Sequence, residues 1–134
     1  MRNKHILLID DDSDERIIFQ DTINSLNADC LFSYAESADD AREQLKFVIP
    51  DVIFLDHNMP RKNGLAFLRE IRESELYSHV PIIFYTTGLT PELSRQAMNA
   101  GATVCIKKYI NIQEFKKLML CIINGAYLLT GNCK

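Results

Sequence analysis

Short apolar runs alternate along this chain with longer segments whose apolar residues recur at helical spacing. The runs predict five strands, which are Ile6–Ile9, Cys30–Ala35, Val52–Leu55, Ile82–Tyr85 and Thr103–Ile106. All but the second read as continuous apolar runs, which is typical of strands buried on both faces of a sheet. The pattern therefore favours a layered fold with a central parallel sheet.

A helix is predicted after each strand, and most of these helices carry a recognisable start signal. Alternating strand–helix units of this length predict an α/β fold with helices on both faces of the sheet. Periodicity alone does not fix the strand order. The start signals are Ser13, Ser37, Thr90 with Pro91, and Asn111 for a long last helix that reaches about Leu128. The third helix is marked instead by the spacing of Leu65, Leu68 and Ile71 after Gly64.

Length and composition narrow the class of protein. The 134 residues suit one domain, and the net charge of -3 gives no reason to expect nucleic acid or an anionic membrane as a partner. No CxxC pair is present, and Cys30, Cys105 and Cys121 lie inside apolar runs, so they are expected to be buried free thiols, which suits a reducing compartment. With no signal peptide or membrane span in the sequence, a cytoplasmic location is expected.

Chemically reactive residues stand just past the ends of the apolar runs. In an open parallel sheet these carboxyl ends share one edge, where ligands bind. Each residue alone has an ordinary explanation, such as a solvated turn or a surface lysine, but their joint placement favours one site. The residues are Asp10 and Asp11, Asp56, Thr86 and Thr87, and Lys107.

The charges of these residues predict a cation. Asp10, Asp11 and Asp56 with Lys107 sum to about -2, and crowded carboxylates repel unless a cation compensates them. Oxygen-only ligands point to Mg²⁺ rather than zinc. The Thr86 hydroxyl can donate a hydrogen bond to a phosphoryl group, and a lysine ammonium can neutralise its charge. An aspartate carboxylate can itself accept the phosphoryl group.

These motifs together resemble the receiver domain of two-component response regulators. They cover nearly the whole chain, roughly residues 4–128. The motifs are Ile9-Asp10-Asp11, Leu55-Asp56-His57-Asn58-Met59-Pro60 with Gly64, Tyr85-Thr86-Thr87, and Gly101-Ala102 leading to Lys107. The resemblance implies a flavodoxin-like, doubly wound, five-stranded parallel sheet in the order 2-1-3-4-5 with five helices, and a single receiver domain over residues 1–134.

The resemblance also implies a role for each site residue. Asp56 matches the phosphoacceptor, while Asp10 and Asp11 match the metal-binding acid pair, with Asp11 preferred as the direct ligand. Asn58 matches the residue whose carbonyl binds Mg²⁺. Lys107 matches the lysine that pairs with the phosphate, Thr86 the switch hydroxyl, and Thr87 a backbone N–H that contacts phosphate.

The resemblance implies that the chain is a signalling module controlled by phosphorylation. Its phosphoryl donor would be a sensor histidine kinase or a phosphotransfer protein, and it would catalyse its own phosphorylation and autodephosphorylation. It would then dock a downstream protein or pass the phosphoryl group along a phosphorelay. Leu120, Cys121 and Ile123 leave little of the last helix polar, so a homodimer or partner contact through that helix is also a hypothesis.

Two positions depart from the family pattern. The proline that usually follows the lysine, joined by a cis bond, is replaced by Lys108, so the Lys107–Lys108 bond is either trans or strained. The aromatic switch residue usual three positions before the lysine is replaced by Val104. These departures put the output coupling in question while leaving the phosphorylation chemistry in place.

Two alternatives stay open. Asp10-x-Asp12 with Thr86 and Lys107 could serve a Mg-dependent phosphohydrolase of the haloacid-dehalogenase type, although no Asp occurs beyond Lys107 to complete its second acidic pair. Val104 and Lys108 instead motivate a docking domain that works without phosphorylation. A flavin site is disfavoured, because the loop after the first strand is acidic and not a phosphate cradle.

Overall fold

The computed structural model describes residues 4–26, 29–108 and 111–124. Within them five strands alternate with five helices, as the hydrophobic pattern predicts. The strands are β1 (Lys4–Ile9), β2 (Cys30–Ala35), β3 (Val52–Leu55), β4 (Ile82–Thr86) and β5 (Val104–Lys107). The helices are α1 (Ser13–Ser25), α2 (Ala38–Leu45), α3 (Gly64–Glu73), α4 (Pro91–Asn99) and α5 (Ile112–Ile123). The predicted end of the last helix, about Leu128, lies outside the described residues.

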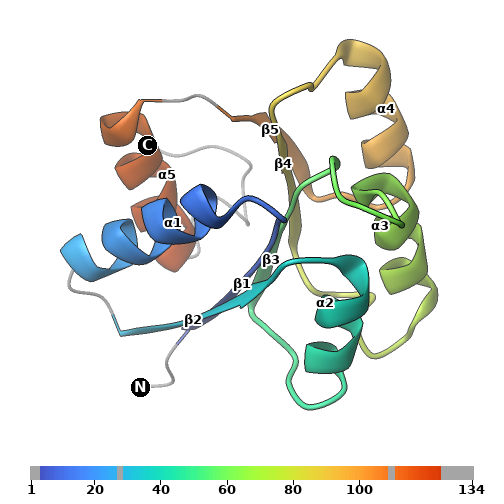
Figure 1. Cartoon of the computed structure of the whole chain (residues 1–134), viewed down its shortest axis with the longest axis horizontal. Coiled ribbons are helices and arrows are strands. Elements are labelled where there is room, and N and C mark those ends of the chain that lie inside the picture. Colours follow the sequence, from blue (N-terminus) through green and yellow to red (C-terminus); the bar gives the residue numbers. More distant parts are fainter. Residues whose placement is uncertain (1–3, 27–28, 109–110, 125–134) are drawn as a thin grey trace.

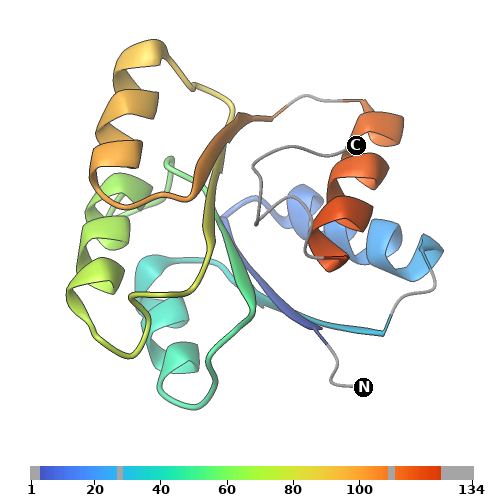
Figure 2. The same cartoon turned by 180° about the vertical axis from the view of Figure 1, so that it is seen from behind.

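All strand pairs are parallel, and the sheet order is β2-β1-β3-β4-β5. This order confirms the expected flavodoxin-like, doubly wound sheet. Helices α1 and α5 cover one face, while α2, α3 and α4 cover the other (Figure 1; Figure 2 gives the view from behind). The carboxyl ends of β1, β3, β4 and β5 therefore open at one edge of the sheet.

Side chains that cap the helices set where most of them begin. Ser37, Asn63, Thr90 and Asn111 each accept a hydrogen bond from a backbone N–H in the first turn. The expected cap of the first helix was wrong by one residue. Asp12, not Ser13, is the N-cap, because its Oδ1 accepts from the Asp14 N–H at 2.9 Å.

The cysteines divide into two groups. Cys30 and Cys105 are free thiols, as expected, but each is only partly buried. Cys121 is instead disulfide-bonded, so the expectation of a free thiol was wrong at that position. No helix in the described part of the chain is both long and apolar enough to cross a bilayer.

Candidate phosphoryl and metal site

Four polar residues lie where the strands end. Asp10 follows β1, Asp56 follows β3, Thr86 closes β4, and Lys108 follows β5. Backbone hydrogen bonds hold three of them in register: the Asp56 N–H donates to the Ile9 carbonyl at 2.9 Å, and the Lys108 N–H donates to the Thr86 carbonyl at 3.0 Å. The strand geometry thus delivers reactive groups from distant parts of the sequence to one place.

The three carboxylates form a cluster. Asp10, Asp11 and Asp56 each offer an oxygen, and these oxygens lie within 4.8 Å of one another. Asp10 and Asp56 are buried, at 0% and 4% exposed, while Asp11 is exposed at the mouth of the cluster. The three aspartates therefore converge as predicted, in an arrangement that could hold a metal ion.

Lys108 supplies the positive charge of the site. Its Nζ donates a hydrogen bond to Asp10 Oδ2 at 2.6 Å and lies 3.7 Å from Asp56 Oδ1. The side chain is only 6% exposed, and its ammonium stands 6.0 Å from the centre of the Tyr85 ring. Packing against an aromatic face stabilises a cation that has left water.

The prediction of Lys107 in this position was wrong by one residue. Lys107 is the last residue of β5, pairs with Thr86 in the sheet register and is exposed. Successive side chains of a strand point to opposite sides, so only one of two adjacent lysines can enter the pocket. The apolar run ends at Ile106 and gave no sign that the strand continues through Lys107.

Because Lys108 and not Lys107 is the pocket lysine, the two departures from the family pattern fall on other residues. The position three before the pocket lysine is Cys105, not Val104, and its Sγ lies 3.7 Å from the Ser94 carbonyl of α4. A thiol is too small to swing between core and solvent as an aromatic ring does. No cis peptide bond occurs in the described ranges, so the Lys107–Lys108 bond is trans. The residue after Lys108 lies outside those ranges.

Among the described residues, two buried side-chain oxygens of the site find no hydrogen-bond partner, Asp56 Oδ1 and Thr86 Oγ1. Buried polar atoms are nearly always paired, so each such atom calls for an explanation. Asp10, by contrast, is fully engaged: its Oδ1 accepts from the Asp12 N–H at 3.0 Å and its Oδ2 from Lys108. These two oxygens therefore mark the side of the pocket on which a bound ligand would complete their hydrogen bonding.

Burial dominates the electrostatics of the pocket. It raises the pKa of Asp10 to about 6, against the opposing effects of the hydrogen bonds from Lys108 and the Asp12 N–H. Burial would lower the pKa of Lys108, but the bond to Asp10 and the nearby Asp56 raise it overall. Burial also raises the pKa of Glu15, which stands close enough to Lys108 to interact with it. The pocket thus holds more negative charge than one lysine can balance.

A close backbone contact fixes the loop that follows Asp56. The Gly64 N–H donates to the His57 carbonyl at 2.9 Å, and a Cβ on Gly64 would clash with the Asp56 carbonyl oxygen. Only glycine fits there without a shift of the backbone. Asn58, whose carbonyl is the predicted metal ligand, lies on this loop with an exposed side chain. Thr87 directly follows β4 and is partly buried.

Sequence reasoning missed the contributions of Tyr85 and Glu15. Tyr85 is 4% exposed and packs its ring against Phe19 and Phe54 at 5.9 and 5.8 Å, so the aromatic core forms one wall of the pocket. An aromatic residue within an apolar strand looks like ordinary core. The position next to Thr86 is the only signal in the sequence that could have suggested contact with the lysine.

The residues present fit Mg²⁺. Hard oxygen donors, an excess of negative charge and an unpaired carboxylate oxygen are what this cation requires. No histidine or cysteine belongs to the cluster, which argues against a zinc site.

Comparison with known proteins places the chain in a family. A profile described as the response regulator receiver domain matches residues 6–120. The chain is 32% identical over 119 residues to chemotaxis protein CheY-3 of Vibrio cholerae, covering 87% of this chain and 88% of that protein. It is 28% identical over 123 residues to the protein-glutamate methylesterase/protein-glutamine glutaminase of Sulfurimonas denitrificans, covering 86% of this chain but only 34% of that longer protein.

Solved structures show the same fold. The phosphorylated cyanobacterial phytochrome response regulator RcpA superposes with a TM-score of 0.84 at 19% identity, covering 98% of this chain and 97% of that one. The profile match spans most of the chain, and the sheet order, the acid cluster and the buried lysine agree with it. The chain is therefore a member of the response regulator receiver domain family.

Proposed function

We propose that this chain accepts a phosphoryl group on Asp56 in a Mg²⁺-dependent reaction and signals by docking a partner or by phosphorelay. The observation that carries the proposal is the buried Asp56 Oδ1, which accepts no hydrogen bond from the described residues and lies beside Asp10, Asp11 and Lys108. A carboxylate with a free lone pair, held next to an ammonium, is what a phosphoryl acceptor needs.

In the proposed transfer, Asp56 Oδ1 forms a bond to phosphorus as the bond from phosphorus to the donor's imidazole nitrogen breaks. The nitrogen keeps the electron pair of that bond, and Asp56 becomes an acyl phosphate. Lys108 lies 3.7 Å from the attacking oxygen and would neutralise charge on the phosphoryl oxygens. Thr86 Oγ1, which has no partner, would donate to one of them, and the Thr87 N–H is proposed to contact another.

Asp10, Asp11, Asp56 and the carbonyl of Asn58 are the groups that would hold Mg²⁺. When bound, the ion would neutralise charge that builds up on the phosphoryl oxygens. Asp11 is proposed as a direct ligand because its side chain is exposed and belongs to the carboxylate cluster. Asp10 already uses both oxygens within the protein.

The phosphoryl donor is proposed to be a histidine kinase or phosphotransfer protein that contacts α1. This helix begins three residues after Asp10, and it exposes Ile17 and Ile18 at 57% and 39%. Ile112 of α5 is 51% exposed, and it lines a groove together with Ile18. Exposed isoleucines on the helix that follows Asp10 suit the apolar face of a partner helix.

The homodimer or partner contact through α5 stays a prediction. Cys121 and Ile122 are buried in the chain's own core, which leaves Leu120 as the exposed apolar residue in the second half of the described helix. A cytoplasmic location and a single receiver domain over residues 1–134 also stay predictions.

The phosphohydrolase alternative receives less support from the site. Its nucleophile would be Asp10, but both Asp10 oxygens already accept hydrogen bonds. Its general acid would be Asp12, whose side chain caps α1. The phosphorylation-independent docking domain is favoured only by Cys105 at the usual switch position.

Phosphoryl uptake tests the proposal. Incubation with acetyl phosphate and Mg²⁺ is expected to add one phosphoryl mass to the wild type and none to Asp56→Asn, measured by intact-protein mass spectrometry. Asp51→Asn is the matched control, because Asp51 precedes β3 at the opposite edge of the sheet. Absence of uptake in a folded wild type would contradict the proposal, as would uptake retained by Asp56→Asn.

A further inference from the structure

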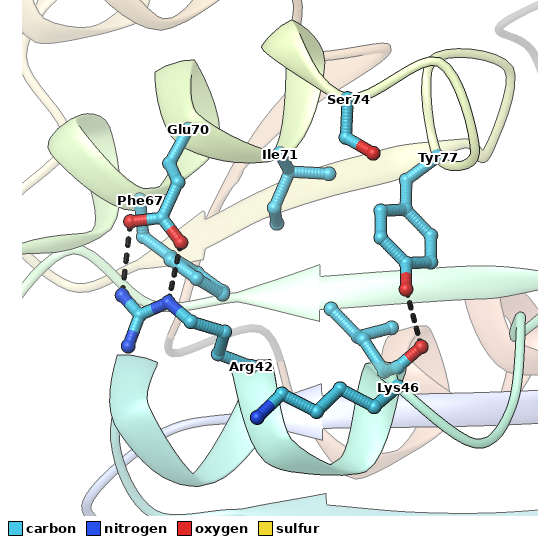
Figure 3. Close-up of a pocket in the computed structure, with 8 residues that line it drawn as sticks. Arg42, Lys46, Phe67, Glu70, Ile71, Ser74 and Tyr77 are labelled. Atoms are coloured by element: carbon cyan, nitrogen blue, oxygen red, sulfur yellow. Dashed lines mark hydrogen bonds and ion pairs between the residues drawn. The ribbon is translucent and has the colours of Figure 1, made fainter.

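A pocket lies between α2 and α3, away from the aspartate cluster. Its volume is about 190 Å³. The buried side chains of Leu45, Phe67 and Ile71 line it, and Lys46 and Ser74 stand at its rim (Figure 3). The pocket therefore combines an apolar interior with a polar opening, which suits an apolar side chain from another molecule.

Hydrogen bonds join the two walls of the pocket at either end. Arg42 of α2 donates to Glu70 of α3 twice, from Nε at 2.6 Å and from Nη2 at 2.9 Å (Figure 3). At the other end the Tyr77 hydroxyl donates to the Leu45 carbonyl. Because these contacts fix both walls, an incoming group would not first have to separate the helices.

Exposed apolar side chains flank the pocket on both sides. Phe47 directly follows the rim residue Lys46 and is 88% exposed, more than any other large apolar residue described. Leu76 directly precedes the lining residue Tyr77 and is 68% exposed. Apolar groups this exposed beside an apolar pocket indicate a contact surface.

The two flanking segments carry opposite charge. The 46–49 segment has the cation Lys46 beside Phe47, whereas the 73–76 segment has the exposed anions Glu73 and Glu75 beside Leu76. A two-fold axis can set the 46–49 segment of one molecule against the 73–76 segment of another, so that opposite charges meet twice.

We propose that the α2–α3 surface binds a second copy of this chain, with Phe47 of each copy entering the pocket of the other. A closed two-fold contact needs a projecting group and its receptor on one surface, and Phe47 and the pocket meet that condition. The intramolecular Lys46–Glu43 pair, 2.8 Å long between largely exposed side chains, is weak enough to exchange for Glu75 of the second copy.

The contact lies at the edge of the sheet opposite the aspartate cluster, since the two segments precede β3 and β4 whereas Asp56 follows β3. Pairing therefore leaves the candidate site open to a phosphoryl donor. The proposal does not rest on the proposed function, because self-association is measured without phosphorylation.

Sedimentation equilibrium of the full chain at concentrations up to about 1 mM tests the proposal. We expect a monomer–dimer equilibrium, and Phe47→Ser is expected to raise the dimer dissociation constant by about tenfold or more, as loss of a central aromatic anchor does. Leu31→Ser is the matched control: Leu31 is 54% exposed but lies on β2, and its loss is expected to leave association unchanged.

A charge exchange tests the orientation of the two copies. Lys46→Glu and Glu75→Lys are each expected to weaken the dimer, and the chain with both changes is expected to regain it, because the reversed charges again meet across the axis. A wild type that stays monomeric would overturn the proposal. So would a dimer that survives Phe47→Ser, a dimer lost instead through Leu120→Ser on α5, or a double variant no tighter than the single ones.

Discussion

Lys108 Nζ is bonded to Asp10 Oδ2 at 2.6 Å but stands 3.7 Å from Asp56 Oδ1. The single buried lysine of the site therefore holds the aspartate that follows β1 more tightly than the proposed phosphoacceptor. Asp56 Oδ1 keeps a free lone pair as a result. The same ammonium is near enough to Asp56 to meet a phosphoryl group that arrives there.

Lys108→Met is expected to slow phosphoryl uptake from acetyl phosphate by about 10²-fold, because it removes the charge that neutralises the phosphoryl oxygens. Methionine keeps most of the apolar stem. Lys107→Met is the matched control, and it should change the rate little because Lys107 is exposed. Rates come from mass spectrometry over time, below the unfolding temperature of each variant. A larger loss in Lys107→Met than in Lys108→Met would refute the assignment.

The sequence predicted the elements of the fold closely because buried parallel strands are uninterrupted apolar runs. The predicted run Val52–Leu55 matches β3, and the caps Ser37 and Thr90 begin α2 and α4 as expected. The strand order came from the family resemblance, since a period-two or period-3.6 pattern carries no information on neighbours.

The site was predicted less completely than the fold. Three aspartates lie where a strand end places them, yet the lysine was assigned one residue too early. The choice between Lys107 and Lys108 depends on the β4–β5 register, in which Lys107 pairs with Thr86. That register is set by packing over the whole sheet, and two adjacent lysines look alike in the sequence. The Arg42–Glu70 bridge joins residues 28 positions apart and likewise has no local signal.

Gly64→Ala is expected to destabilise the chain by about 1–3 kcal/mol, because the new Cβ overpacks against backbone atoms that cannot rotate away. It should also lower phosphoryl uptake, since the displaced backbone carries Asp56. Urea unfolding and the uptake rate measure the two effects. Gly88→Ala is the control, because no atom lies within 4 Å of a Cβ there. Equal stability of the two variants would show that the loop is not constrained as described.

Glu70→Gln is expected to make stability depend less on pH. The hydrogen bonds from Arg42, followed by that from Lys62, lower the pKa of Glu70 from 4.5 to about 2. Because the pKa is lower in the folded state, the ionised carboxylate stabilises folding above about pH 4.5, and this contribution is lost as the pH falls towards 2.

The loss in Glu70→Gln should be about 1 kcal/mol at pH 7, since the side chain is 32% exposed and solvent screens the pair. The difference from wild type should shrink as the pH falls from about 4.5 to about 2, in urea unfolding series at several pH values. Glu43→Gln, which removes the more exposed pair with Lys46, should change stability by less than about 0.5 kcal/mol. A constant Glu70→Gln difference over that pH range would mean that the ionised carboxylate does not stabilise the fold.

Arg72→Ala is expected to be among the more destabilising single changes outside the apolar core. The Arg72 guanidinium donates from Nε to the Gly101 carbonyl at 2.9 Å and from Nη1 to the Val80 carbonyl at 2.7 Å, so it joins the end of α4 to the segment before β4. Truncation leaves both carbonyls without this donor, at about 1–3 kcal/mol for each that stays buried and unpaired. We expect a total loss of about 2–4 kcal/mol in urea unfolding.

Arg69→Ala, on the exposed side of α3, should cost less than about 0.5 kcal/mol. Arg72→Lys should recover only part of the loss, because one ammonium cannot reproduce the planar fork that reaches two loops at once. Full recovery by lysine would mean that the positive charge, and not the paired geometry, is what these carbonyls require.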